Sequence, residues 1–331
     1  MVALARTSRK QPQQSELSPF GADVLEGLRA APKRIPAKYF YDEAGSALFE
    51  KITEQPEYYP TRCEMQALRD HASEIAKLIP EGAALVEFGS GSNKKARILL
   101  DAVRPLACYV PVDISGEMLA GEAAELRADY PNLKVLPVVA DFCYPFDLPE
   151  EARTAPVRVG FFPGSTLGNF EPHEAAAFLR NVARILGSNS VLIIGVDLIK
   201  DADVLNAAYN DAADVTAAFN LNLLTRINRE LSGNFDLAAF EHHAFYNRER
   251  NRIEMHLASL KRQKVKVLGE AIEFRAGETI HTENSYKYSV DSLRALARGV
   301  GWLPDGVWTD KQGYFSIQAF TLTQEPPRPA P

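Results

Sequence analysis

Residues 85–92 read L-V-E-F-G-S-G-S, a short apolar run that ends in a Gly-Ser-Gly turn, and a second apolar run at residues 108–113, C-Y-V-P-V-D, ends in an acid. A strand, a tight glycine turn, a helix and a second strand tipped by an acid form the adenosine-binding unit of open α/β folds. The glycines let the backbone approach the ligand, and the acid accepts hydrogen bonds from a ribose diol. The pattern therefore predicts a parallel, doubly wound sheet with an adenosine site at Gly89, Ser90, Gly91 and Asp113.

The residues around this turn distinguish between two adenosine cofactors. A dinucleotide site needs G-x-G-x-x-G, and Lys94 stands where the third glycine would let the helix pack closely on the strand. Glu87 fits poorly beside a pyrophosphate but suits S-adenosylmethionine (SAM), which carries an ammonium and a sulfonium. A further acid, Asp141, follows the apolar run at residues 135–142, where an adenine amine could be recognised. The glycines alone leave a plain strand-to-helix turn open, whereas the acids favour SAM over NAD.

Composition excludes several other classes of protein. The net charge of −6 gives no electrostatic footprint for nucleic acid, and no apolar run approaches the length of a membrane span. The N-terminal stretch M-V-A-L-A-R-T-S-R-K lacks the apolar core of a signal peptide. The cysteines are widely spaced and odd in number, which indicates neither a disulfide framework nor a zinc cluster. We therefore expect a cytoplasmic protein with free thiols at Cys63, Cys108 and Cys143.

The order of the remaining segments predicts an α/β core with a second part inserted into it. Apolar runs predict further parallel strands, and after them the pattern changes to a helical stretch, then to alternating segments and a polar stretch ahead of a C-terminal helix. Strands around that helix suit a sheet whose last strands form an antiparallel pair. The predicted strands lie near 108–113, 134–140, 157–163 and 190–197, the helical stretch at 201–231, the alternating segments at 242–247, 252–261 and 264–268, the polar stretch at 277–289 and the helix at 290–299.

We expect a Rossmann-like methyltransferase core with an added α+β substrate-binding domain. The expected divisions are a disordered leader at 1–18, an N-terminal helical and lid segment of the substrate domain at 19–80, a SAM-binding core at 81–200, a substrate-binding insertion at 201–285, a C-terminal helix and strands that complete the core sheet at 286–322, and a disordered tail at 323–331.

A second chemical signal follows the predicted strand at 157–163. The stretch F-F-P-G-S-T-L-G-N-F at residues 161–170 lies at the carboxyl edge of the sheet, where open α/β folds bind their ligands. Asn169 offers a carbonyl acceptor and an amide donor, so it can orient an amine or a carboxylate. An alternative is that Asn169 is the N-cap of the helix that follows. The two roles are compatible.

Several stretches, in this order, carry a resemblance to a known family: K-Y-F-Y-D-E-A-G-S-A-L-F, P-E-Y-Y-P-T-R, V-E-F-G-S-G-S-N-K-K, P-G-S-T-L-G-N, A-A-Y-N-D-A-A-D-V-T-A-A-F-N, R-I-E-M-H-L and T-E-N-S-Y-K. The chain resembles the SAM-dependent histidine Nα-methyltransferases, which trimethylate the α-amine of L-histidine to hercynine on the route to ergothioneine. The resemblance runs from about Lys33 to Phe320, and it implies a monomer.

The resemblance implies a role for each matching residue. It assigns the α-amino and α-carboxylate end of histidine to Asn169 and Tyr209, and the imidazole to Glu283 and Ser285. It places Tyr58 on the imidazole through water, Tyr41 near the amine and Met255 along the ring pocket, so Tyr41 and Asn169 are the candidate catalytic residues. The SAM-contacting positions match Gly89, Lys95, Asp113, Asp141 and Phe142, and we add Ser90 and Gly91 from the glycine turn and Gly164 from the stretch at 161–170.

One position departs from the family pattern, and the other roles have plainer alternatives. Where this chain has Asn284-Ser285-Tyr286, the family often has Val-Ser-Cys, so Asn284 either adds a substrate contact or faces solvent. Tyr58 could simply pack the lid, Tyr209 could be a core aromatic, and Glu283 could be a solvated strand residue. We expect no metal, because the spacing of the remaining histidines is not that of a metal site: His242, His243, His256 and His281.

The physical chemistry of these positions fits transfer to an amino acid. A buried acceptor such as Glu283 rejects side chains that cannot donate a hydrogen bond, because they leave the carboxylate unpaired. No strong dedicated base is apparent, so Tyr41 is expected to orient the amine or to pass its proton to water. Two other functions remain open, namely methylation of another amino acid such as tryptophan and a non-catalytic SAM-fold module that serves a partner.

Overall fold

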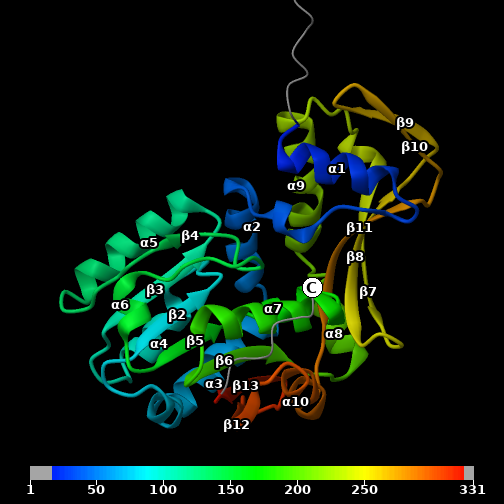
Figure 1. Ribbon diagram of the computed structural model, residues 1–331. Helices are drawn as coiled ribbons and strands as arrows, with labels where there is room; N and C mark the ends of the chain where they lie inside the picture. Colours follow the sequence, from blue (N-terminus) through cyan, green and yellow to red (C-terminus); the bar gives the residue numbers. More distant parts are fainter. Residues whose placement is uncertain (1–16, 324–331) are drawn as a thin grey trace, which may run out of the picture.

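The described part of the chain contains a seven-stranded sheet with the order β12-β13-β6-β5-β2-β3-β4 (Figure 1). The computed structural model describes residues 17–323, so the expected leader and tail lie almost wholly outside the described residues. Strands β2 to β6 are parallel, whereas β13 is antiparallel to β6 and β12 is antiparallel to β13, which confirms the predicted antiparallel pair. The strands are β2 (Ala84–Phe88), β3 (Cys108–Asp113), β4 (Val138–Val139), β5 (Arg158–Phe162), β6 (Ser190–Asp197), β12 (Leu303–Thr309) and β13 (Phe315–Leu322).

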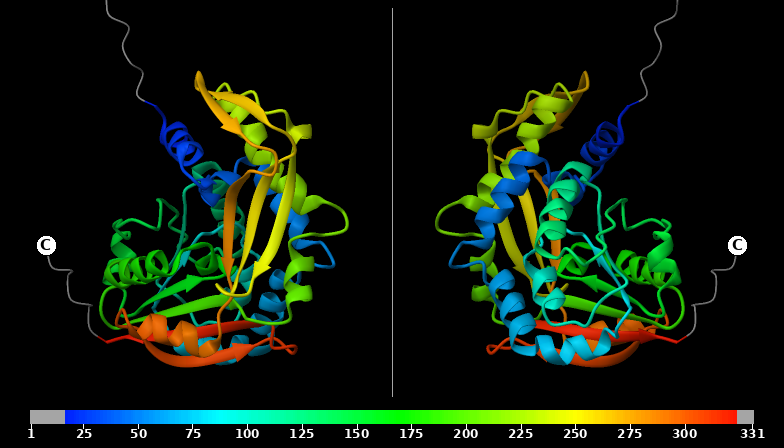
Figure 2. Two further views of the ribbon diagram at one scale, coloured as in Figure 1. Left: turned by 90° about the vertical axis from the view of Figure 1, so that its right-hand side faces the viewer. Right: turned by 90° about the vertical axis from the view of Figure 1, so that its left-hand side faces the viewer.

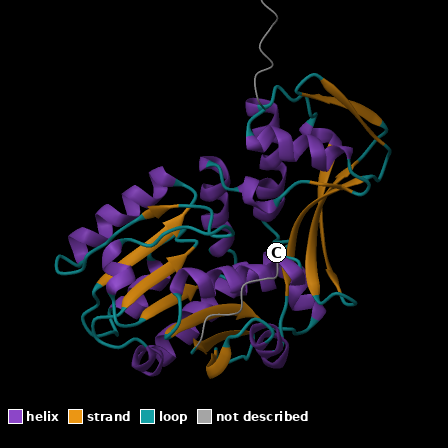
Figure 3. Ribbon diagram, in the orientation of Figure 1, coloured by secondary structure: helices purple, strands orange, loops and turns teal. Residues whose placement is uncertain are grey.

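Helices cover both faces of this sheet (Figure 3). One face packs against α3 (Tyr59–Ile75), α4 (Lys94–Leu100) and α5 (Gly116–Asp129), and the other against α6 (Glu150–Thr154), α7 (Pro172–Leu186) and α10 (Val290–Arg298). Because both faces are buried, the parallel strands are almost continuously apolar. The predicted doubly wound α/β class is thus confirmed, and the carboxyl ends of the parallel strands share one edge.

The strand predicted at 134–140 is much shorter than expected. Of this segment, only Val138 and Val139 form a strand, β4, beside β3. An isolated bridge also joins Val135 to Tyr109. Pro137 lies between the two, and proline has no backbone N–H to donate to a ladder. The break leaves the chain after β4 free to turn over the sheet edge, where Asp141 and Phe142 follow.

A second sheet stands beside the carboxyl edge of the first (Figures 1 and 2). Its order is β1-β11-β8-β7, and the hairpin of β9 and β10 extends from it. The predicted polar stretch at 277–289 is a strand, β11, for most of its length. It lies between β1 and β8, so neighbouring strands fix its backbone whatever its side chains are. The strands are β1 (Lys33–Arg34), β7 (Phe240–Asn247), β8 (Arg252–Ser259), β9 (Gln263–Val267), β10 (Glu270–Phe274) and β11 (Thr279–Tyr286).

The helical stretch predicted at 201–231 is two helices, α8 (Ala202–Ala208) and α9 (Val215–Glu230). The break occurs because the Asp211 carboxylate accepts hydrogen bonds from the Val215 and Thr216 amides at 2.8 Å and starts a new helix. It leaves Tyr209 at the end of α8, where its side chain is free to turn inward. Helix α9 packs against β7 and β8.

The N-terminal segment divides between the two sheets. Helices α1 (Pro19–Arg29) and α2 (Glu43–Thr53) lie with α9 and the second sheet, whereas α3 lies against the seven-stranded sheet. One hydrophobic cluster runs from the α3 face into α9 and β8, so the two sheets share a core. Four short 3₁₀ turns complete the described chain: η1 (Ala37–Phe40), η2 (Ala76–Leu78), η3 (Thr166–Asn169) and η4 (Leu237–Ala239). Among the helices of residues 17–323, none has the length and apolar character needed to cross a bilayer.

Candidate active site

The glycine turn after β2 is held in a shape that only glycine adopts easily. Gly89 has φ +75°, and its N–H and that of Ser90 both donate to the Val112 carbonyl, at 2.9 and 3.1 Å. A Cβ on Gly89 would lie 3.4 Å from the Phe142 ring, whereas a Cβ on Gly91 would meet no heavy atom within 4 Å. The turn therefore presents open backbone beside an aromatic ring, a cradle that fits an adenosine.

Glu87 does not lie as the sequence suggested. Its carboxylate accepts hydrogen bonds from the Tyr109 hydroxyl and from Ser90 Oγ, the latter at 3.3 Å, and the residue is only 1% exposed. Burial raises the pKa of Glu87 to about 7, although these donors oppose the shift. Glu87 thus supports the turn from within the core. Because the Ser90 hydroxyl and N–H are both used inside the protein, Ser90 shapes the turn and has no free donor for a ligand.

The acids after β3 and β4 lie at the same edge of the sheet. Asp113 pairs with Val139 in the ladder, and Asp141 follows two residues later. One Asp113 oxygen accepts the Ser115 amide at 2.9 Å, and the backbone amides of Ser115 and Ile114 are the donors that act on this carboxylate. Burial raises the pKa of the Asp113 carboxyl. Asp113 therefore keeps an acceptor free for a ribose hydroxyl, as the adenosine assignment requires.

Lys95 and Gly164 are joined by an acid that sequence reasoning missed. Glu64 on α3 lies 2.5 Å from Lys95 Nζ and accepts the Gly164 N–H with both oxygens, at 2.8 and 3.0 Å. A Cβ on Gly195 would come within 2.2 Å of Glu64 Oε1, so glycine at that position makes room for the carboxylate. Nothing in the sequence around Glu64 signals this role, because its partners come from β5, β6 and α4.

Asn169 ends η3, the turn that follows β5, and the N-cap alternative for it is wrong. The N-cap of α7 is Glu171, which forms a capping box with Glu174. Asn169 is half-buried, and its amide makes no hydrogen bond to any residue that the structure describes. The loop lies against β11, because a Cβ on Gly168 would be only 2.7 Å from the Tyr286 carbonyl oxygen. Asn169 is therefore held at the junction of the two sheets with its amide free.

Gly168 provides a test of this junction. We expect Gly168→Ala to lower the free energy of unfolding by about 1–3 kcal/mol and to reduce catalytic turnover, because the new methyl overlaps backbone atoms of Tyr286. Gly121→Ala on α5 is the matched control, since a Cβ there meets nothing within 4 Å and alanine favours a helix. Urea denaturation and steady-state kinetics measure both effects. Equal stability of the two variants would contradict a tight junction.

The second sheet aligns three of the predicted site residues. Glu283 on β11 lies directly opposite Met255 on β8, and Ser285 is two residues further along the same strand. Because alternate residues of a strand share a face, all three lie on the face that α9 covers. Glu283 follows an irregularity in the ladder after His281. Burial raises the pKa of Glu283 to about 7, and the positive charge of Lys287 opposes the rise.

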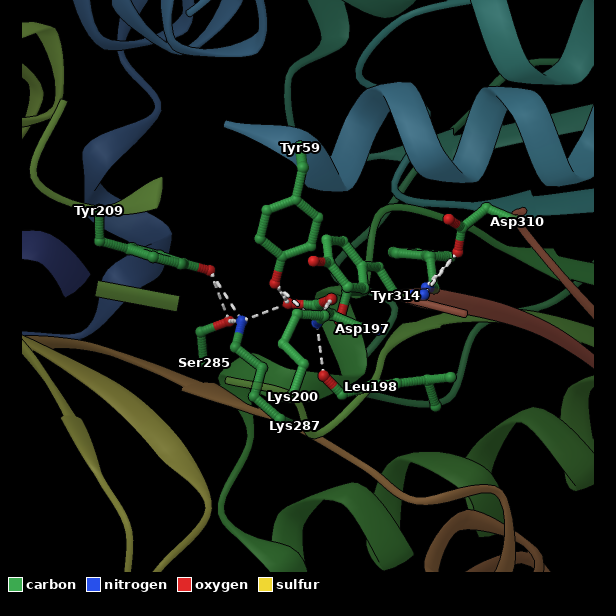
Figure 4. Close-up of polar contacts among 11 residues, drawn as sticks. Tyr59, Asp197, Leu198, Lys200, Tyr209, Ser285, Lys287, Asp310 and Tyr314 are labelled. Atoms are coloured by element: carbon green, nitrogen blue, oxygen red, sulfur yellow. Dashed lines mark hydrogen bonds and ion pairs between the residues drawn. The ribbon is translucent and has the colours of Figure 1, made fainter. Parts of the chain in front are cut away.

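Lys287 links the predicted substrate residues to the core sheet (Figure 4). Its ammonium donates to Ser285 Oγ at 2.9 Å and to the Tyr209 hydroxyl at 3.2 Å, and the Tyr209 hydroxyl itself donates to Ser285 Oγ at 2.7 Å. It also pairs at 2.8 Å with Asp197, the last residue of β6, and both side chains are only 1% exposed. The buried ammonium of Lys287 therefore holds the hydroxyl groups of both Tyr209 and Ser285 in place.

The same carboxylate gathers a second group of residues. Asp197 accepts the Tyr59 hydroxyl at 2.7 Å and pairs with Lys200 at 2.6 Å, as Figure 4 shows. Burial alone would raise the pKa of Asp197, but Lys287 and Lys200 lower it below its usual value. Lys287 lies in the family-like stretch T-E-N-S-Y-K and Asp197 ends a predicted strand, yet sequence reasoning gave neither a role.

The predicted tyrosines form one wall of the site. The rings of Tyr58 and Tyr209 lie 6.2 Å apart, and Phe49 lies 6.3 Å from Tyr58 and 5.7 Å from Tyr41. Tyr41 is 39% exposed as a residue, yet its pKa is raised well above the usual value, first by burial of the phenol and then by the negative charges of Glu283 and Asp113. Tyr41 therefore lies within electrostatic reach of both Glu283 and Asp113, the expected imidazole and ribose ends.

Asn284 is not brought together with the other predicted substrate residues. It lies on the opposite face of β11 from Glu283 and Ser285, and its amide donates to Glu171 at 3.1 Å. It is only 8% exposed, so the alternative that it faces solvent is wrong. The histidines also differ from expectation, because His256 and His281 lie together with Glu254 on that same face.

These features define a class of enzyme. A parallel sheet with an antiparallel end, a glycine turn after β2, acids after β3 and β4, and a free amide after β5 are together the architecture of a SAM-dependent methyltransferase. Residues 20–322 match the sequence model of a family described as "Histidine-specific methyltransferase, SAM-dependent", and the chain belongs to this family.

Curated relatives agree with that assignment. The chain is similar to a protein named histidine N-alpha-methyltransferase from Mycolicibacterium smegmatis, with 43% identity over 89% of this chain and 92% of the relative. It is 40% identical to one of the same name from Mycobacterium tuberculosis, with the same coverage of both chains. It is 31% identical to ergothioneine biosynthesis protein 1 from Neurospora crassa over 84% of this chain, which spans 32% of that longer protein.

Proposed function

We propose that the protein transfers methyl groups from SAM to the α-amine of L-histidine until the amine is trimethylated, giving hercynine. Family membership and the names of the two mycobacterial relatives support the substrate. The observation that carries the proposal is a buried carboxylate, Glu283, on the same sheet face as Ser285 and within electrostatic reach of Tyr41. The name of the Neurospora relative supports a place in ergothioneine biosynthesis.

The proposed pose places the two ends of histidine against different sheets. The imidazole lies against Glu283 on β11, whose carboxylate accepts a ring N–H, with Met255 beside it. The amino-acid end lies towards Asn169 and Tyr209, and the Tyr209 hydroxyl is oriented by Lys287 and Ser285. A site built around a hydrogen bond to the ring rejects side chains that cannot make it, since the carboxylate would be buried unpaired.

The chain itself supplies position and exclusion of water rather than covalent chemistry. Bound SAM provides an electrophilic methyl on a sulfonium, and Gly89, Gly91, Asp113 and Phe142 are the residues proposed to hold it. Asn169 orients the amine, since its amide has no partner among the described residues. Each transfer releases one proton from the substrate nitrogen. The pKa of Tyr41 is well above its usual value, so the phenol stays protonated and orients the amine or relays its proton to water.

The test is a substrate screen. The purified protein is incubated with SAM and each common amino acid in turn, and the products are analysed by mass spectrometry. We expect a gain of three methyl groups on histidine and none on the others. Product from tryptophan in place of histidine would support the alternative specificity, whereas the absence of product from every amino acid would overturn the enzymatic assignment.

The pKa of Glu283 predicts a pH dependence. Because that pKa is raised to about 7, the side chain is a neutral acid below this pH and a carboxylate acceptor above it. We expect the ratio of kcat/KM for histidine between the wild type and Glu283→Gln to rise from about pH 6 to pH 8. The ratio cancels the titration of histidine itself, which both proteins share. A ratio that stays flat over this range would contradict the role of the carboxylate.

We further propose a cytoplasmic monomer that uses no metal for methyl transfer. Its cysteines are free in the described chain, with Cys63 and Cys108 buried, which supports a reducing compartment. Light scattering on the eluting protein tests the monomer, and full activity after exhaustive chelation tests the metal independence. A dimer mass or loss of activity with chelator would contradict the respective proposal.

A further inference from the structure

The outer face of the second sheet, opposite α9, carries a cluster of potential metal ligands. His281 on β11 lies directly across from His256 on β8, and Glu254 is two residues before His256 on the same face. One ligand atom from each of Glu254, His256 and His281 lies within 4.8 Å of the others. The left view of Figure 2 looks onto these strands with α9 behind them. Glu254 and His281 are 27 positions apart in the chain, so the pairing register of β8 and β11 brings the three residues together.

One imidazole nitrogen of this cluster, His281 Nε2, is buried and makes no hydrogen bond to any described residue. His256 Nδ1 also has no partner there, but it lies on the other side of its ring from Nε2, the nitrogen that meets Glu254. A buried polar atom without a partner costs free energy, and such atoms in a folded protein call for a ligand or an ion. His256 Nε2 lies 3.2 Å from Glu254 Oε2, so the carboxylate is already turned towards the histidines.

The charges around the cluster favour a cation. Arg252 pairs with Glu171 at 2.7 Å and with Glu254 Oε1 at 2.8 Å, so its single positive charge is shared by two carboxylates. With neutral imidazoles the group carries a net negative charge. Arg252 also fixes Glu254 through Oε1 and leaves Oε2 directed at the histidines, as an outer residue orients a ligand in a metal site.

We propose that Glu254, His256 and His281 bind a divalent transition-metal ion of the zinc type. Two imidazoles and one carboxylate suit such an ion, which bonds nitrogen and oxygen at about 2.0–2.2 Å in tetrahedral sites. That geometry places neighbouring ligand atoms about 3.3 Å apart. The Glu254–His256 pair already has nearly this separation, and the His281 ligand atom, which lies within 4.8 Å of both, must approach them more closely when the ion binds. Water completes the coordination.

The metal site is separate from the proposed methyl-transfer site. Met255 and Glu283 point to the inner face of the same strands, so the ion would lie behind the imidazole pocket without entering it. It would clamp β8 to β11 beside the ladder irregularity that precedes Glu283. The bound ion would make the strand pair more rigid. Because a ligand that binds only the folded protein stabilises that state, the ion would also raise the melting temperature.

Zinc titration of the full-length protein tests the proposal. We expect one Zn²⁺ per chain by calorimetry after chelator treatment, and a rise in melting temperature on adding Zn²⁺. Replacement of a ligand, His281→Ala or Glu254→Gln, should weaken binding by about 100-fold or more, beyond the 10- to 100-fold that an outer partner costs. His173→Ala is the matched control, because His173 is exposed on α7. Binding of Co²⁺ should give a visible spectrum typical of tetrahedral coordination.

The zinc site and its clamping of the two strands are supported or overturned by separate results. Retained methyl transfer by the two ligand variants shows that they are folded, so their loss of Zn²⁺ binding would support the site directly. If they bind Zn²⁺ as the wild type does, or if His173→Ala loses as much affinity as His281→Ala, the site is overturned. Failure of the melting temperature to respond to Zn²⁺ in the wild type would overturn the clamp.

Discussion

Glu283→Ala is expected to weaken histidine binding by about 10- to 100-fold while SAM binding stays unchanged. Glu283 lies on the inner face of β11 opposite Met255, whereas the glycine turn follows β2 in the other sheet, and no side-chain hydrogen bond of Glu283 is present within the described residues. The expected loss follows from a charged hydrogen bond to the ring, which contributes about 1.5–3 kcal/mol. The effect should appear in KM rather than in the binding of the methyl donor.

Calorimetry with histidine and, separately, with SAM measures the effect, at a pH above 7 where the carboxyl is ionised. Glu273→Ala is the matched control, because Glu273 on β10 is exposed and pairs only loosely with Lys264, at 3.5 Å. It should change neither affinity. Equal loss of both affinities in Glu283→Ala would contradict the imidazole role and indicate general disruption of the site.

Lys287→Met is expected to lower the free energy of unfolding by about 3–5 kcal/mol and to impair histidine binding as well. Methionine leaves the buried Asp197 with only Lys200 as a cationic partner. Removing one member of a buried ion pair destabilises the fold, because the free energy of burying the other charge is no longer compensated. The Tyr209 and Ser285 hydroxyls lose a shared donor at the same time. Stability and affinity should therefore fall together.

Urea denaturation measures the stability, and calorimetry with histidine measures the affinity. Lys264→Met is the control, since the Lys264–Glu273 pair is solvent-exposed, and such pairs contribute about 0–1 kcal/mol. If Lys287→Met is as stable as this control, Asp197 is compensated by Lys200 alone and the proposed link between the sheets is wrong. Unchanged histidine affinity would separately remove Lys287 from the substrate site.

The local patterns of the chain predicted the core sheet well. Strands β3, β5 and β6 lie within a residue or so of their predicted bounds, because parallel strands buried on both faces need continuous apolar runs that the sequence displays directly. The predictions failed where the run was interrupted or polar. Pro137 shortened β4, and β11 formed from a polar stretch because its neighbours β1 and β8 supply the ladder.

The candidate site was predictable in part. Gly89, Asp113 and Asn169 follow strands, and strand ends meet at one edge of a parallel sheet, so their grouping follows from order alone. Asn284 shows the limit of the approach. Neighbouring residues of a strand point to opposite faces of the sheet. Asn284 and Ser285 are adjacent in the sequence, so their side chains lie on opposite faces of β11.

The sequence by itself determined the class of the fold, the cofactor turn and the family, because these depend on runs of neighbouring residues. The tertiary structure alone decided which charges are paired. Glu64 meets Gly164 across 100 positions of the chain, Asp197 meets Lys287 between two sheets, and His281 meets His256 through a strand register. No local pattern encodes such pairs, since their energy arises from burial and is absent until the sheets have packed.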